Sequence, residues 1–195
     1  DPYEEDLVNT YLPTERRVRR FSAKERADHI MGMNGTFDDI EGFSGRVLDY
    51  KWEFLGEKKI LSIVNSRQTE NVAWYGPHSR LPDDIWQVRD HYVVRADPVW
   101  EGNPVKSRIM FLDKETFNVA LGLIINREDK LWKTMQTVHK VFDESNVAGF
   151  FGMSMTDQLN NTTTICSKLT PTEYPVRTPK EIKRTFSVSS LSEGQ

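Results

Sequence analysis

Two stretches in the middle of the chain alternate apolar and polar residues with a period of two, which is the pattern of a half-buried β-strand. The first stretch is 86–96 and the second is 116–126. The apolar positions that share a phase are Trp86, Val88, Tyr92, Val94 and Ala96 in the first, and Phe117, Val119, Leu121, Leu123 and Ile125 in the second. Two strands with one apolar face each are typical of an antiparallel sheet that is packed on one side and wet on the other.

Neighbouring segments extend this pattern into a meander. The further predicted strands are Ser107–Asp113, Leu131–Phe142, and an earlier pair, Arg46–Phe54 and Lys59–Asn65, around Gly56-Glu57. The connections at Asp97–Pro104 and Arg127–Lys130 have the Pro, Gly and charged residues of hairpin loops. We therefore predict a mainly β fold, in which strand follows strand from about residue 46 to residue 142. A sheet that is apolar on one side must close on itself, pack on other elements or hold a ligand.

The rest of the chain is expected to contain long loops and one or two short helices. The chain has 195 residues, the size of one domain. Residues 1–45 are predicted to form a hairpin over Tyr11–Phe21, a short helix from Ser22 to His29 and an acidic, Gly-rich loop over Gly32–Gly45. Residues 143–195 are predicted to be a loop-rich C-terminal segment with final strands, mostly irregular from Ser167 onward.

Composition excludes several classes of protein. Lys plus Arg is 26 and Asp plus Glu is 29, so the net charge of 26 − 29 = −3 argues against nucleic-acid binding. No apolar run approaches the roughly 20 residues needed to span a bilayer. The one cysteine, Cys166, excludes an internal disulfide. Because the chain begins at Asp1 without a signal sequence, we expect a processed or truncated product.

The candidate catalytic groups are weak. Asp38, Asp39 and Glu41, with His29, could hold a cation or exchange a proton, but a solvated acidic turn explains them better. His91 is expected at the surface and Cys166 in the core, and no Gly-x-Ser-x-Gly elbow is present. We therefore expect no enzyme, metal or cofactor, and keep a hydrolase that uses the loop of Asp38, Asp39 and Glu41 as the weakest alternative.

Four arginines within five residues form the strongest charged cluster of the sequence. They are Arg16, Arg17, Arg19 and Arg20. On a strand they would divide between both faces, and a structural role at a sheet edge is the simpler interpretation. The alternative is contact with an acidic partner or with lipid headgroups.

The 21 aromatic residues are the remaining candidates for a binding site. Most are explained by core packing. A concave sheet lined by Trp, Phe and Leu would also form a site for an acyl chain. The residues predicted to line this concave apolar face are Trp52, Phe54, Trp86, Val88, Tyr92, Val94, Ile109, Phe111, Phe117, Val119, Leu121, Leu123 and Trp132.

The order of these segments resembles a family of Gram-negative envelope proteins of unknown function with the fold of the lipoprotein carriers LolA and LolB. The match is distributed over residues 10 to 142, with a looser match of Phe186–Val188 to the family's final strand. The segments that carry it are Tyr11–Pro13, Arg16–Arg20, Asp38–Phe43, Gly45-Arg46, Asp49–Trp52, Leu55–Lys58, Trp86–Asp90, Tyr92–Val94, Arg108, Phe111–Glu115 and Leu131–Lys133.

The resemblance implies a curved, half-barrel antiparallel sheet around an apolar cavity, in the periplasm or at the inner face of the outer membrane. It implies a protein that carries or senses a lipid or other hydrophobic molecule, together with an exporter of the RND type. It also implies longer relatives, of which this chain is the C-terminal half, so that the absent half or a second copy would cover the sheet edge. The alternative is a structural or regulatory interaction module without a ligand, like the envelope-stress regulator RseB.

Overall fold

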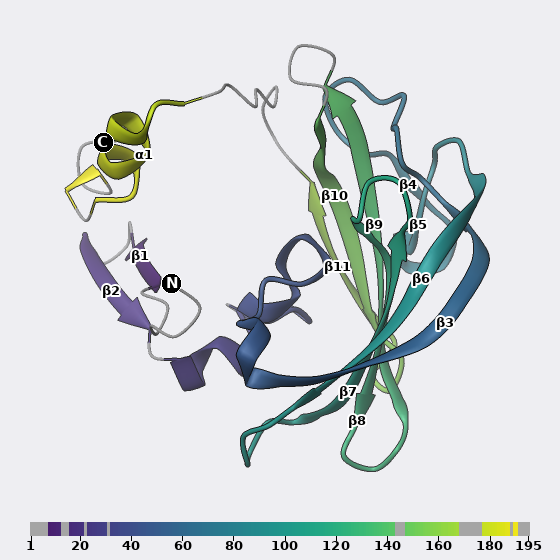
Figure 1. Cartoon of the computed structure of the whole chain (residues 1–195), viewed down its shortest axis with the longest axis horizontal. Coiled ribbons are helices and arrows are strands. Elements are labelled where there is room, and N and C mark those ends of the chain that lie inside the picture. Colours follow the sequence, from purple (N-terminus) through teal and green to yellow (C-terminus); the bar gives the residue numbers. More distant parts are fainter. Residues whose placement is uncertain are drawn as a thin grey trace.

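The computed structural model describes residues 8–12, 16–21, 23–30, 32–142, 147–167, 177–187 and 189–190. In this part of the chain, seven strands form one antiparallel sheet that is not closed into a barrel, in the order β11-β10-β9-β8-β7-β6-β3. Figure 1 shows that the sheet is strongly curved. Its strands are β3 (Tyr50–Ser62), β6 (Gln87–Pro98), β7 (Val105–Asp113), β8 (Val119–Asn126), β9 (Leu131–Phe142), β10 (Val147–Asp157) and β11 (Thr162–Ser167). The predicted antiparallel meander is thereby confirmed.

Short elements surround the sheet. They are the hairpin β1 (Val8–Leu12) and β2 (Arg17–Phe21), the 3-10 turns η1 (Ala23–Ala27), η2 (Phe37–Gly42), η3 (Val47–Asp49) and η4 (Pro77–Ser79), the pair β4 (Trp74–Tyr75) and β5 (Leu81–Pro82), and the helix α1 (Pro179–Thr185). In the described residues, no helix is both long and apolar enough to cross a bilayer.

β3 is one continuous strand, so the predicted break into two strands around Gly56-Glu57 is wrong. The long strand β6 pairs with β3 along its whole length, from Tyr50↔Pro98 to Ser62↔Gln87. Gly56 lies at a β-bulge and has φ +112°, a conformation that glycine adopts without strain. The glycine therefore bends the strand without ending it.

The C-terminal region differs from the sequence prediction in two ways. Residues 147–167 form the regular hairpin β10–β11, and α1 follows where an irregular tail was expected. Thr178 caps α1 in a capping box with Glu181, and Pro179 occupies the first turn, a start signal that is present in the sequence. Phe186 ends this helix, so the predicted final strand at 186–188 is wrong for Phe186 and Ser187, and Val188 lies outside the described residues.

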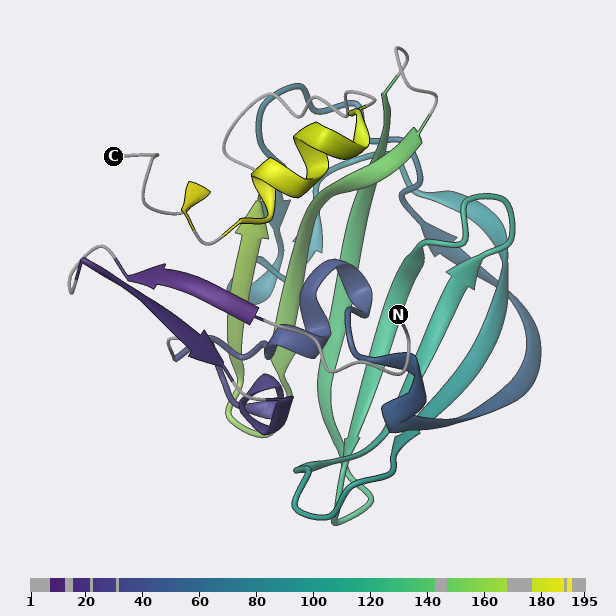
Figure 2. The same cartoon turned by 60° about the vertical axis from the view of Figure 1, so that its left-hand side comes forward.

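One segment lies on the concave side of the sheet, and we call it the inner segment. It comprises the described residues of 23–49, with η1, η2 and η3. Gly42 packs against Val119 so closely that an added Cβ would lie 2.6 Å from the valine Cβ, and Gly35 lies against the sulfur of Met155. Figure 2 shows the inner segment in front of the central strands.

The main core lies between the inner segment and the concave face. Its buried members include Met110, Ile124, Met135 and Met155. Gly122 on β8 leaves room for Met135, because a Cβ at this position would lie 2.8 Å from the Met135 methyl group. The inner segment therefore packs against small and flexible apolar side chains of the sheet.

A second, smaller core lies on the opposite, convex face. The segment between β3 and β6 folds over the ends of β9 and β10, where Ile63, Val72, Val138 and Phe151 are buried together. Ser154 of β10 donates a hydrogen bond to the carbonyl oxygen of Arg80 in this segment, at 2.7 Å. The sheet is thus covered in part on both faces.

Buried ion pairs attach the inner segment to the sheet. The guanidinium of Arg108 on β7 pairs with Asp39, and both side chains are almost completely buried. Asp39 also accepts hydrogen bonds from the backbone N–H and the hydroxyl of Thr36, at 2.8 and 2.9 Å. The prediction of a solvated acidic turn is therefore wrong for Asp39 and also for Asp38, because arginines distant in sequence bury both carboxylates.

Asp38 has its own set of partners. It accepts hydrogen bonds from Arg26 at 2.9 Å and from the hydroxyl of Tyr50 at 2.7 Å. Burial, together with the neighbouring Asp38 carboxylate, raises the pKa of Tyr50 far above its usual value, so the phenol stays a donor. On β9, the buried Lys133 donates to the carbonyl oxygen of Asn34 at 2.6 Å.

The variant Asp39→Asn tests the role of this ion pair in stability. It leaves the buried Arg108 guanidinium without its counter-charge, and loss of one partner of a buried pair typically costs about 3–5 kcal/mol. We expect the free energy of unfolding, measured by urea titration, to fall by this amount. The control is Glu41→Gln in the same turn, where the side chain is exposed and little change is expected. An equal effect of both substitutions would contradict this role of the pair.

His139 on β9 gives the protein a defined sensitivity to acid. Its side chain is buried, and burial lowers the pKa of His139 to about 4, below its ordinary value of 6.5. A group with a depressed pKa in the folded state binds its proton more readily when unfolded, so its contribution is present above pH 6.5 and is lost as the pH falls toward 4. The full effect is about 3 kcal/mol.

We expect urea titrations at pH 7.5, 5.5 and 4 to show this loss in the native chain and a smaller one in His139→Leu. His78→Asn is the matched control, because His78 is exposed and Asn tolerates its positive φ of 56°. A pH dependence that is unchanged in His139→Leu would show that other groups cause it.

Candidate functional site

The inner segment covers only part of the concave face and leaves an apolar surface open beside it. The exposed side chains of this surface lie on the two strands β3 and β6 and on the turn between β7 and β8. They are Trp52, Phe54, Leu61, Val88 and Phe117, between 40% and 69% exposed. Tyr92, Val94 and Leu112 lie between them and are partly buried. We call these eight residues the open concave surface.

Sheet register places these residues on one face. Trp52 pairs with Ala96, Phe54 with Val94, and Leu61 with Val88. Val94 pairs in turn with Met110 of the main core. Because partners in an antiparallel ladder lie on the same side of a sheet, the open concave surface continues the core that lies under the inner segment.

Aromatic contacts connect the open concave surface across three elements. The rings of Phe54 and Tyr92 meet edge to face with their centroids 6.1 Å apart. Tyr92 and Phe117 stack with their centroids 6.3 Å apart. Such pairs hold large side chains in fixed positions, so the surface is already formed without a ligand.

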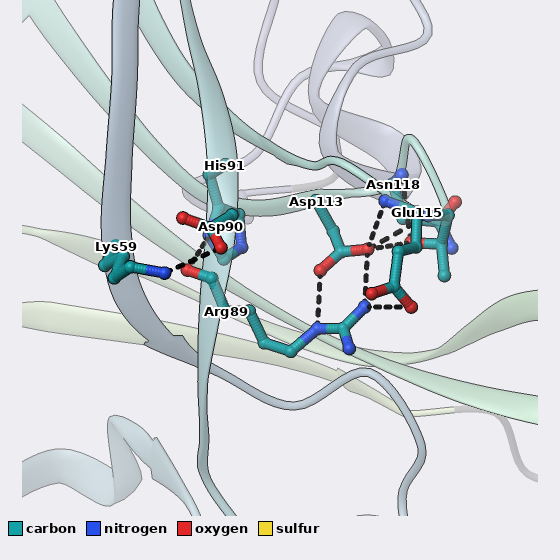
Figure 3. A network of polar contacts seen from close by, with 8 residues as sticks. Lys59, Arg89, Asp90, His91, Asp113, Glu115 and Asn118 are labelled. Carbon is teal, nitrogen blue, oxygen red and sulfur yellow. Dashed lines mark hydrogen bonds and ion pairs between the residues drawn. The ribbon is translucent and has the colours of Figure 1, made fainter.

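The turn that carries Phe117 is built around Asp113. Its buried carboxylate accepts hydrogen bonds from Arg89 Nε at 2.9 Å and Nη2 at 3.0 Å, and from the backbone N–H groups of Glu115 and Thr116 at 3.0 and 2.9 Å. Burial alone would raise the pKa of Asp113, but these hydrogen bonds lower it to about 2. Figure 3 shows Arg89 held between Asp113 and Glu115.

Phe117 itself has an unfavourable backbone conformation. Its φ is 59°, in the left-handed region that bulky side chains rarely adopt, and its side chain is largely exposed. The backbone N–H of Phe117 bonds to the carbonyl oxygen of Asp113 at 2.8 Å. The turn therefore imposes this conformation, and the exposed aromatic ring is kept over Tyr92 at a cost in strain.

Sequence reasoning predicted thirteen residues for one concave face, and the structure divides them. Trp52, Phe54, Val88, Tyr92, Val94 and Phe117 belong to the open concave surface, and Val119 lies on the same face but is covered by Gly42. The prediction is wrong for Ile109, Phe111, Leu121 and Leu123. Arg95↔Ile109↔Leu123 and Val93↔Phe111↔Leu121 are register neighbours, so these four residues lie on the convex face.

Two other predicted tryptophans lie outside the open concave surface, but only Trp86 is on the wrong face, because Trp132 packs against the main core on the concave side. Trp86 precedes β6 and packs against the convex core. Trp132 donates from Nε1 to Asp157 at 3.0 Å and has its ring beside His29. Sequence reasoning missed Leu61 and Leu112, which share a phase with Val88 and Tyr92 only through the register of neighbouring strands.

The other predicted groups have no arrangement that suggests catalysis. Asp38 and Asp39 are engaged by arginines, while Glu41 is exposed. His91 on β6 is fully buried, so its predicted place at the surface is wrong. Cys166 is exposed on the edge strand β11, so its predicted place in the core is wrong as well.

The arginine cluster lies on the hairpin β1–β2. Arg16, at the turn, and Arg17 and Arg20, on β2, are exposed. Figure 1 shows this hairpin and α1 across from the concave face, apart from the seven-stranded sheet. A cavity of about 730 Å³ beside α1 is lined by residues that include Lys180, Glu181 and Arg184, and is distinct from the open concave surface.

Substitution of Phe117 by asparagine tests the strain in the turn. Asn tolerates the left-handed region, so relief of about 1 kcal/mol of strain would offset the lost ring contact with Tyr92, about 0.5–1.5 kcal/mol. We expect the free energy of unfolding of Phe117→Asn to stay within about 1 kcal/mol of the native value. Phe54→Asn, on β3 of the same surface, should be the more destabilising change, because Phe54 does not have a positive φ and its substitution relieves no strain. A larger loss in the free energy of unfolding for Phe117→Asn than for Phe54→Asn would show that the backbone of Phe117 is not strained.

A family model described as "Protein of unknown function (DUF1329)" matches residues 1–192. None of the curated proteins compared with the sequence matches it.

Three solved structures resemble the fold. A domain from Vibrio parahaemolyticus, described as an outer membrane lipoprotein-sorting protein, is 17% identical, with a TM-score of 0.62 over 98% of this chain and 68% of that one. A DUF1329 family protein from Desulfovibrio piger is 16% identical, with a TM-score of 0.64 over 97% and 66%. A LolA superfamily protein from Nitrosomonas europaea is 13% identical, with a TM-score of 0.52 over 95% and 68%. The chain thus spans about two thirds of the length of each of these structures, and the similarity confirms the LolA-like fold.

Proposed function

This chain belongs to the DUF1329 family of proteins of unknown function, and we propose that it binds a lipid or another hydrophobic molecule on the open concave surface. The proposed role is that of a carrier or sensor in the bacterial cell envelope, without enzymatic activity. The observation that supports it best is the surface itself, with five exposed apolar side chains on one face of a curved sheet and on the adjoining turn.

Physical chemistry favours an apolar occupant. Contiguous apolar surface on a folded domain, such as that formed here by the rings of Phe54, Tyr92 and Phe117, marks a site of interaction. Each methylene group of a ligand that is removed from water contributes about 0.8 kcal/mol, so an acyl chain laid along Trp52, Phe54 and Phe117 would gain several kcal/mol from contact alone. Such binding requires a preformed apolar surface that fits the shape of the ligand, and it requires no reactive group.

The comparisons support the cellular part of the proposal. One structure with this fold is described as an outer membrane lipoprotein-sorting protein and another as a member of the LolA superfamily. We propose the periplasm or the inner face of the outer membrane as the location, and an exporter of the RND type as the partner. We also propose that a further segment of a longer chain, or a second copy, covers the edge of β3, which is the outermost of the described strands on that side of the sheet.

The second candidate function is a protein-interaction module without a ligand. The exposed Arg16, Arg17 and Arg20 on the separate hairpin β1–β2 favour it, because a cationic hairpin suits an acidic partner. In that case the open concave surface would bind no small hydrophobic molecule.

A titration with N-phenyl-1-naphthylamine, a neutral fluorescent probe of apolar sites, tests the binding function. The chain is first unfolded and refolded to remove bound lipid. We expect saturable binding, and at least fivefold weaker binding to Phe117→Asn, which removes the strained aromatic ring of the site and is expected to stay folded. A fivefold change corresponds to about 1 kcal/mol.

Phe186→Asn provides the control, because this phenylalanine is exposed beyond α1 and away from the site. Its affinity for the probe should equal that of the native chain. Absence of saturable binding would contradict the proposed function and favour the interaction module, and equal losses in both variants would place the binding elsewhere.

A further inference from the structure

Two ion pairs lie on the same face as the open concave surface. Lys59 Nζ is 2.7 Å from Asp90, and Lys114 Nζ is 2.9 Å from Glu57. Lys59↔Asp90 and Glu57↔Tyr92 are register partners between β3 and β6. The charged groups therefore form a polar row across the concave face, between the aromatic residues and Leu61 with Val88. Figure 3 shows the pair of Lys59 and Asp90.

One of the two cations, the Lys114 ammonium, lies against the aromatic residues of the open concave surface. We call Trp52, Phe54, Tyr92 and Phe117 the aromatic wall. The Lys114 ammonium is 5.0 Å from the centroid of the Tyr92 ring, the ring that also contacts Phe54 and Phe117. Lys114 immediately follows Asp113, whose hydrogen bonds fix the turn. This ammonium is therefore held at the boundary between the apolar surface and the polar row.

The two carboxylates are more open to water than this cation. The side chain of Lys114 is 30% exposed, whereas Glu57 and Asp90 are 52% and 53% exposed. The hydrogen bond that Lys114 donates to Glu57 raises the pKa of Lys114, and the hydrogen bond that Asp90 accepts from Lys59 lowers the pKa of Asp90, so both pairs are ionised at neutral pH. Because the Lys114 ammonium lies against the Tyr92 ring, a molecule bound on that ring would lie next to this cation, while water can solvate the more exposed carboxylates.

From this arrangement we propose that the ligand is an amphiphile with an anionic oxygen headgroup, a carboxylate or a phosphate. This inference rests on the proposed function. The apolar part would lie on Trp52, Phe54 and Phe117, and the headgroup would lie between Lys59 and Lys114. Because exposed ion pairs contribute little to stability, the lysines can exchange Asp90 and Glu57 for the headgroup while water solvates the released carboxylates.

The test compares ligands that share a ten-carbon chain and differ in charge. Decanoate, decyl phosphate, decan-1-ol and decyltrimethylammonium compete with bound N-phenyl-1-naphthylamine at pH 7.5 and low salt. We expect decanoate or decyl phosphate to bind at least fivefold more tightly than decan-1-ol, and added salt to reduce the difference. Comparison of the two anions identifies which headgroup the site prefers.

The double variant Lys59→Gln/Lys114→Gln removes both cations. We expect its affinity for the anions to fall to that for decan-1-ol, with the affinity for decan-1-ol itself unchanged. The matched control is Lys58→Gln/Lys106→Gln, which changes the net charge equally. Lys58 pairs with His91, out of phase with Lys59, and Lys106 pairs with Asp129 at the opposite end of β7. The control should keep the preference for anions.

Each other outcome overturns the inference. Equal affinities of the native chain for the anions and for decan-1-ol would show that the lysines do not recognise a headgroup. Tighter binding of decyltrimethylammonium would assign recognition to Asp90 and Glu57. An equal loss of anion binding in both double variants would show that the net charge of the protein, and not the position of Lys59 and Lys114, causes the preference for anions. Failure of all four ligands and of the probe to bind would contradict the proposed function itself.

Discussion

The buried pair of Arg108 and Asp39 is the interaction on which the arrangement of this protein depends. It connects the centre of the sheet to a loop almost seventy positions earlier in the chain, and neither charge could remain buried alone. Around it, Arg26, Asp38 and Tyr50 form a second set of hydrogen bonds. These contacts hold a segment with little regular structure against one face of a curved sheet.

The position of the inner segment defines the candidate site. Where it lies, the concave face has small or flexible residues, and Gly42 and Gly122 permit close approach to Val119 and Met135. Beyond the part that the inner segment covers, the concave side presents exposed aromatic side chains, namely those of Trp52, Phe54 and Phe117. The same sheet face therefore serves as a core in one part and as an open surface in the other, without a break in the packing between Val94 and Met110.

The turn between β7 and β8 forms one edge of the open concave surface, and its backbone is strained at Phe117. The carboxylate of Asp113 organises a six-residue turn, 113–118, that places Lys114 over Tyr92 and holds Phe117 in the left-handed region. Neither the exposed ring nor its conformation is favourable for an isolated domain. Features of this kind are concentrated at functional sites, where the surrounding structure over-determines them.

The sequence by itself determined the sheet, because a period of two in 86–96 and 116–126 is a local property of the strand backbone. It also indicated the apolar character of Phe54, Tyr92 and Phe117. It assigned Ile109, Phe111, Leu121 and Leu123 to the wrong face, since β7 and β8 have apolar residues on both sides and bulges shift their register.

Tertiary structure alone decided which carboxylates are buried and which apolar residues stay open. Asp38 and Asp39 have the local sequence of a solvated turn, and only the long-range contacts with Arg26 and Arg108 bury them. The open concave surface likewise exists because the inner segment covers one part of the face and not the other. Contacts between residues distant in sequence depend on register and curvature, which no local pattern encodes.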